Sequence, residues 1–104
     1  MANIKLYKND DLVFEKRGVL LEDKYVFENI FYDYGNNILV RENDDFKYLL
    51  DFKNKIASVE LKAHNYSLDL KINTISMDLN DTKHIITYSI ESEDNAVNIL
   101  EVFF

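Results

Sequence analysis

The residues best suited to metal binding or acid–base catalysis are few, because the sequence has two histidines and no cysteine. A pair of imidazoles and a carboxylate would suffice for a zinc site. His64 and His84 are nevertheless far apart and lack the short ligand spacing of a metal-binding motif. His64 stands in a polar turn beside Asn65, whereas His84 begins an alternating segment. We interpret both as exposed or half-buried polar residues, and we expect neither a bound metal nor a cofactor.

Nucleophilic and acidic residues are more common, but none has the sequence surroundings of a catalytic group. The serines lie outside any Gly-x-Ser-x-Gly turn, which hydrolases use to expose a nucleophile. The aspartate pairs that begin at Asp10 and Asp44 lack the spaced oxygen ligands of a calcium loop. Gly18 and Gly35 are the only glycines, which excludes a glycine-rich phosphate loop. The sequence therefore predicts a protein that is not an enzyme and has no catalytic residues.

Tyrosine is the most informative residue type in this sequence, which contains seven tyrosines and seven phenylalanines. A tyrosine has an apolar ring and a polar tip, so several of them pointing into one barrel mouth would line a binding site for a small molecule. Aromatic residues are also favoured in strands for ordinary packing, which is the alternative interpretation. The candidate ligand contacts are Tyr25, Tyr32, Tyr48 and Tyr88.

The last segment, from Val97 to Phe104, is apolar on both faces of the strand that it predicts. Leu100, Val102 and Phe104 share one face, opposite Ile99. A strand that is apolar on both faces is covered on both, either by its own chain or by a partner subunit. We therefore include Leu100, Val102 and Phe104 in the candidate ligand or partner surface, and we consider a homodimer or another protein partner.

The charge balance argues against several kinds of partner. The formal net charge is −7, with 12 basic residues against 19 acidic ones, and the only arginines are Arg17 and Arg41. Nucleic-acid binding needs Lys and Arg gathered on one face, so we expect no nucleic-acid partner and no binding to anionic lipid. No segment has the apolar length of a signal peptide or a membrane helix, and we therefore expect a cytoplasmic protein.

Apolar and polar residues alternate with a period of two along most of the chain, which is typical of strands with one buried face. In one such segment, His84, Ile86 and Tyr88 alternate with Ile85 and Thr87. Short clusters rich in Asn and Asp separate the segments and predict turns, because both residues tolerate a left-handed backbone. The expected strands are residues 3–8, 11–17, 24–33, 37–42, 45–52, 55–63, 66–79, 83–91 and 96–103.

The expected strand 66–79 changes face partway along its length. Leu70 and Ile72 alternate in one phase, whereas Ile75 and Met77 follow the other, which predicts a β-bulge near residues 73–74. Short loops favour a meander, so we expect all of residues 1–104 to form one all-β domain. This domain is a small lipocalin-like (calycin-like) antiparallel barrel of about eight or nine strands, with a β-sandwich as the alternative. The segment 19–21 is a candidate short helical turn.

A family resemblance covers mainly the second half of the chain, residues 46–104. It is carried by the Phe-Lys-Tyr-Leu-Leu segment from Phe46, by the Leu-x-Leu-x-Ile-x-Thr strand from Leu68 to Thr74, and by two closing strands. This order resembles the YwiB-like proteins of low-GC Gram-positive bacteria. The resemblance implies a bacterial protein with a lipocalin-like barrel, and it implies no active site.

Two functional hypotheses from different classes follow. The barrel and its tyrosines favour a non-catalytic binding module for a small apolar or amphipathic ligand. The two-faced last strand favours a protein–protein interaction module or a self-associating chain that uses the sheet surface. The interior of the barrel discriminates between them, because an interior filled with side chains leaves no room for a ligand.

Overall fold

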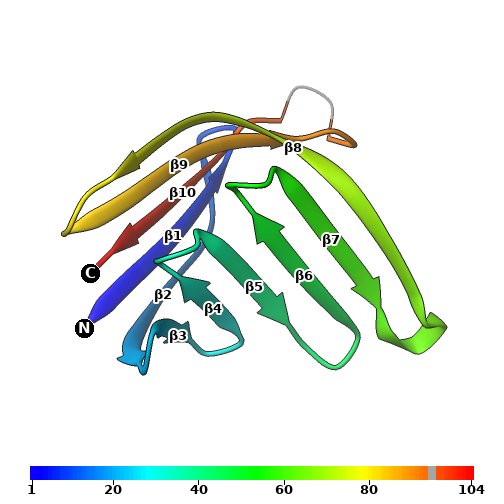
Figure 1. Ribbon diagram of the computed structural model, residues 1–104, viewed down its shortest axis with the longest axis horizontal. Helices are drawn as coiled ribbons and strands as arrows, with labels where there is room; N and C mark the ends of the chain where they lie inside the picture. The colour runs from blue at the N-terminus through cyan, green and yellow to red at the C-terminus, as the bar shows by residue number, and fades with distance from the viewer. Residues whose placement is uncertain (94–95) are drawn as a thin grey trace.

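The computed structural model describes residues 1–93 and 96–104 and shows a closed antiparallel barrel of ten strands in these residues (Figure 1). The strands are β1 (Ala2–Lys8), β2 (Asp11–Leu21), β3 (Lys24–Phe27), β4 (Ile30–Asp33), β5 (Ile38–Glu42), β6 (Phe46–Asp51), β7 (Ile56–Leu61), β8 (Tyr66–Leu79), β9 (Lys83–Ile90) and β10 (Asn98–Phe103), and a 3₁₀ helix, η1, spans Lys62–His64. The prediction of an all-β antiparallel barrel is confirmed.

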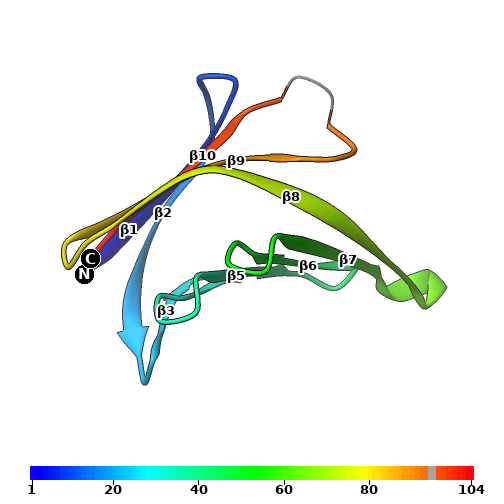
Figure 2. The same cartoon turned by 45° about the horizontal axis from the view of Figure 1, so that its top comes forward.

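The chain is a meander in which each strand pairs with the next one, and β1 pairs with β10 to close the barrel. The barrel is flattened into two facing sheets (Figure 2). One sheet contains β1, β2, β8, β9 and β10, and the other contains β2 to β8, so the long strands β2 and β8 run through both. The two termini lie side by side, because Asn3 pairs with Phe103.

The interior follows from the alternation of side chains along the strands. In β9, Ile86 and Tyr88 are buried, as the alternation predicts, and His84 is buried on the same face. In β10, Leu100 and Val102 are fully buried. The fully buried apolar residues come from β1, β3, β4, β8, β9 and β10 and from the turn after β6; they are Ile4, Phe27, Ile30, Tyr32, Phe52, Ile72, Ile86, Leu100 and Val102. One continuous core therefore joins the two sheets.

The number of strands exceeds the expected eight or nine, because the segment 24–33 is not one strand. It divides into β3 and β4 around the pair Glu28-Asn29, where Glu28 has a φ of 58°. The segment 19–21 is also extended, not helical, and it forms the end of β2, where Val19 pairs with Val26 and Leu21 pairs with Lys24.

The β-bulge predicted in the segment 66–79 is present, and it lies between Thr74 and Ser76 in β8. Thr74 pairs with Tyr88 and Met77 pairs with Ile86, so the inserted residue is Ile75, whose side chain is exposed instead of sharing the inner face with Met77. A bulge adds one residue to one strand and increases the local twist. It lies a few residues beyond the point where β8 passes from one sheet to the other, since Lys71 still pairs with β7 and Ile72 pairs with β9.

Asparagine and aspartate shape several of the turns, as the sequence predicted. Asn9, Asp10, Asn37 and Asn65 adopt positive φ angles, whereas neither glycine does. In the turn before β6, Asn43 Oδ1 accepts hydrogen bonds from the backbone N–H groups of Asp45 and Phe46, at 2.8 and 2.9 Å. Among the described residues, no helix has the length and apolar character needed to cross a membrane.

Candidate functional site

The barrel interior is filled at one end and open at the other. The filled end lies near the termini, where Phe27, Tyr32 and Val102 are fully buried. At the opposite end, an open pocket of about 320 Å³ lies between the two sheets. Its wall comes from both sheets and from the chain between β9 and β10; it is formed by Leu6, Lys8, Val13, Phe14, Leu39, Arg41, Tyr48, Leu50, Tyr88, Ile90, Glu93 and Asn98.

The pocket wall combines an apolar surface with a few polar groups. Leu6, Leu50 and Ile90 belong to the apolar part and pack against the core. Arg41 enters the pocket from β5, two residues after the buried Leu39, so the two side chains share the inner face of the strand. A pocket of this volume, with an apolar wall and a few polar groups, is typical of sites for small ligands.

The guanidinium of Arg41 lies over the aromatic ring of Phe14, with its central carbon 5.3 Å from the ring centroid. This cation–π contact holds a half-buried cation inside the barrel mouth. Among residues 1–93 and 96–104, no carboxylate lies within ion-pair distance of Arg41. The guanidinium therefore has hydrogen-bond donors that can face a molecule in the pocket.

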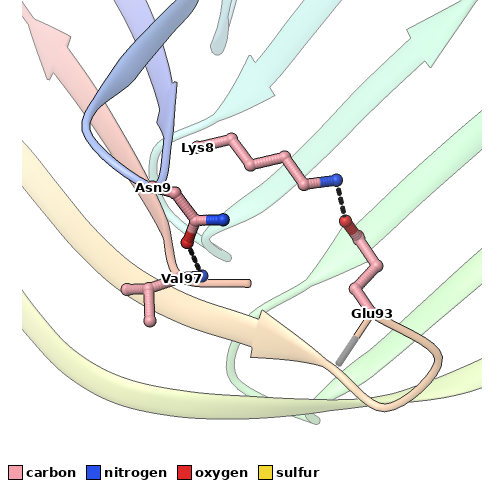
Figure 3. Close-up of polar contacts among 4 residues, drawn as sticks. All are labelled: Lys8, Asn9, Glu93 and Val97. Carbon is pink, nitrogen blue, oxygen red and sulfur yellow. Dashed lines mark hydrogen bonds and ion pairs between the residues drawn. The ribbon is translucent and has the colours of Figure 1, made fainter. Parts of the chain in front are cut away.

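Three polar contacts tie the β1–β2 hairpin to the chain before β10 at the rim of the pocket, and Figure 3 shows the two that involve the side chains of Lys8 and Asn9. The Lys8 ammonium donates a hydrogen bond to the carboxylate of Glu93. The side chain of Asn9 accepts a hydrogen bond of 2.9 Å from the backbone N–H of Val97. The backbone N–H of Asn9 also donates to the carbonyl oxygen of Val97 at 2.9 Å. The rim is thus held by three contacts across one side of the mouth.

Asn98 begins β10 and lines the pocket with a buried polar side chain. It is 4% exposed, and it shares the inner face of β10 with Leu100. Its Nδ2 atom is buried and finds no hydrogen-bond partner among the described residues. A buried donor without an acceptor is unfavourable, which marks this position as one where a bound molecule would add a missing contact.

The four candidate tyrosines divide between the two ends of the barrel. Tyr48 and Tyr88 line the pocket, as the hypothesis of a ligand site requires. Burial raises the pKa of the Tyr88 phenol well above its usual value, and the nearby Glu93 carboxylate adds to this effect. Tyr25 and Tyr32 lie at the filled end instead. The Tyr25 ring stacks on the ring of Phe104 there, with 4.8 Å between the ring centroids.

Tyr32 belongs to a buried polar network with His84 and Asn37. Burial raises the pKa of Tyr32 to about 12, against the opposing effect of the hydrogen bond from Asn37. The Asn37 Nδ2 group donates to the Tyr32 oxygen at 3.1 Å, and the Tyr32 hydroxyl lies 2.7 Å from Nδ1 of His84. Burial lowers the pKa of His84, which favours the neutral ring, and the tautomer protonated at Nε2 would accept the hydrogen bond of the Tyr32 hydroxyl at Nδ1.

The two histidines therefore lie in different environments. His84 is 8% exposed and belongs to this network, so its expected exposed or half-buried position is wrong, because an inward position in β9 buries it. His64 is exposed in η1. Within the described part of the chain, no group of three His, Asp or Glu side chains is placed to hold a metal ion.

The C-terminal candidates lie mainly in the core. Leu100 and Val102 are fully buried inside the barrel, so they form neither the pocket wall nor an outer surface. Phe104 is half-buried at the filled end, where its ring lies 4.8 Å from that of His84. The outer face of β10 is carried by Ile99 and Phe103 instead.

A second apolar feature lies on the outer face of the other sheet. Five paired residues form a continuous row across β2 to β6; they are Val19, Val26, Phe31, Val40 and Leu49. Val19 is 51% exposed and Phe31 is 36% exposed. Part of this row forms the floor of a shallow groove of about 420 Å³, which Lys24 and Lys47 flank on the same face as Asp33.

The sequence matches no protein-family model, and no curated protein and no solved structure is significantly similar to it. The function must therefore be inferred from the barrel pocket and from the outer apolar row.

Sequence reasoning missed four polar residues of the pocket: Lys8, Arg41, Glu93 and Asn98. A signal for Asn98 was present, because it lies in phase with the apolar residues Leu100 and Val102. Arg41 gave a weaker signal, since it follows the unbroken apolar run from Ile38 to Val40, in which the inner and outer faces cannot be told apart.

Proposed function

We propose that this protein is a non-enzymatic binding module that holds a small amphipathic molecule in the open end of its barrel. The observation that carries the proposal is the pocket of about 320 Å³ between the sheets. Ligand sites are typically concave, mostly apolar and supplied with a few convergent polar groups. Leu6, Phe14 and Leu50 supply an apolar wall here, and Arg41 and Asn98 supply polar groups.

Binding of 1-octanol tests this proposal, because octanol has an apolar chain, a polar end and no charge. We expect it to shift the amide resonances of pocket residues in ¹H–¹⁵N NMR spectra. Leu50→Phe should weaken this binding about tenfold or more, since added volume in a pocket of this size competes directly with the ligand. Leu49→Phe is the matched control, because its side chain lies in the outer row.

The ratio of the octanol dissociation constants of Leu50→Phe and Leu49→Phe distinguishes binding in the pocket from nonspecific hydrophobic binding elsewhere on the protein. If octanol bound both variants equally, or if neither octanol nor octanoate changed the wild-type spectrum at saturation, the barrel interior would not be a binding site.

Self-association is a second candidate function, and it is favoured by the outer apolar row from Val19 to Leu49. Contiguous exposed apolar patches are typical of interaction sites. The occupant that fits most directly is a second copy of the chain, because groove charges of both signs, such as Lys24 and Asp33, allow opposite charges to meet across a two-fold axis.

Native mass spectrometry tests this candidate by measuring the subunit number. We expect a dimer for the wild-type chain and a monomer for Val40→Lys, because a lysine at the centre of the row would be buried without a partner in the interface. Asn73→Lys, on the other sheet and exposed, should leave the dimer intact. A wild-type chain that is monomeric at high micromolar concentration would remove self-association from consideration.

A further inference from the structure

We infer that the ligand of the barrel pocket carries a carboxylate head group, which Arg41 and Asn98 bind, on an apolar body that packs against Leu6, Phe14 and Leu50. This inference rests on the proposed function, because it names the chemical class of the molecule that the pocket holds. Three features of the pocket wall support it.

The first feature is the local charge. The chain has a net charge of −7, yet the pocket wall carries two cations, Lys8 and Arg41, and one anion, Glu93. The carboxylate of Glu93 is already bound by Lys8 at the rim. Arg41 is therefore the charge left to act on a bound molecule, in a protein whose remaining surface repels anions. A pocket with this balance favours an anionic ligand over a neutral or cationic one.

The second feature is the position of the guanidinium. Arg41 is half-buried on the inner face of β5, and its guanidinium carbon lies 5.3 Å from the centroid of the Phe14 ring. The N–H groups of a guanidinium project from the edge of its plane, and no carboxylate of residues 1–93 and 96–104 lies within ion-pair distance of them. A guanidinium edge matches the two oxygens of a carboxylate, with which it forms paired hydrogen bonds.

The third feature is the orphan donor of Asn98. Its side chain is 4% exposed and lines the same pocket, and its Nδ2 has no acceptor within the described part of the chain. The Tyr88 hydroxyl on the same wall stays protonated, since burial raises its pKa, so it adds no negative charge. An acceptor from the ligand would satisfy the Asn98 donor, as a carboxylate oxygen can.

Isothermal titration calorimetry with three probes of equal chain length tests the inference: octanoate, 1-octanol and octylammonium. For the wild-type protein we expect octanoate to bind most tightly and octylammonium most weakly. Arg41→Met should weaken octanoate binding about ten- to a hundredfold, which is the usual range for a lost charged hydrogen bond, and should change octanol binding by less than about twofold. Arg17→Met, on the exposed outer side of β2, is the matched control and should leave all three affinities unchanged.

The wild-type ranking needs no variant, so the inference stays testable even if Arg41→Met fails to fold. Asn98→Leu provides a second variant, which should weaken octanoate more than octanol. If octanol bound the wild-type protein as tightly as octanoate, the carboxylate inference would be overturned while the proposed function stood. If none of the three probes bound, the proposed function itself would fail.

Discussion

Replacing Gly18 by alanine should destabilise the barrel by about 3 kcal/mol and lower its melting temperature by at least about 10 °C. An added Cβ at this position would stand 2.5 Å from the ring of Phe27, which is fully buried, and closer still to the carbonyl oxygen of Val26. Backbone and a buried ring cannot move aside without parting β2 from β3. Thermal melting followed by circular dichroism measures the effect.

The position of Gly18 in β2 explains why space is so limited. Gly18 makes the last pair with β1, opposite Ala2, and the next residue, Val19, makes the first pair with β3. The strand therefore passes from one sheet to the other at this glycine, and a residue without a side chain lets the backbones approach closely. The requirement is one of space, since the φ angle of Gly18 is not positive.

Gly35→Ala is the matched control for this prediction. A Cβ there would meet only Asp33 Oδ1, at 3.6 Å, and Gly35 also lacks a positive φ. We expect its stability to change by about 0.5 kcal/mol or less. Equal melting temperatures for the two variants would mean that β2 and β3 do not approach each other as closely as described.

The strand pattern could be predicted from the sequence because alternation is a local property. The inner face of β9, with Ile86 and Tyr88, follows directly from the period of two, whereas the burial of His84 on that face was not expected. The bulge in β8 was likewise visible as a change of phase before Met77. The break at Glu28-Asn29 was missed, because two polar residues between apolar ones also fit a continuous strand.

The pocket could not be predicted in the same way, because it depends on which side chains meet across the barrel. Tyr25 and Tyr48 both point inward, but only Tyr48 lies at the open end. The difference arises from residues distant in sequence: Phe104 stacks on Tyr25, whereas Arg41 and Leu50 leave space near Tyr48. The space left inside the barrel depends on the volumes of side chains from all ten strands, and no local sequence pattern indicates that sum.

The largest loss of stability is expected from Leu100→Asp. Leu100 is fully buried, between Leu6 on β1 and Ile86 on β9. A carboxylate there would be buried without a partner, and the cost of several kcal/mol is comparable with the roughly 5–15 kcal/mol that holds a domain of this size folded. We expect circular dichroism to show an unfolded chain. The milder Leu100→Ala should remain measurable, with a loss of about 2–5 kcal/mol.

Ile99→Asp is the matched control, because its side chain points outward from β10, between Tyr7 and Thr87. It should cost about 1 kcal/mol, the usual span of strand preferences, and leave the chain folded. Unfolding of both variants would mean that the outer face of β10 is covered as well, as it would be by a partner subunit. A folded Leu100→Asp variant with the wild-type melting temperature would have a wider consequence. Residues 98 and 100 share one face of β10, so the Asn98 donor would then point away from the pocket, and the carboxylate site would lose one of its two binding groups.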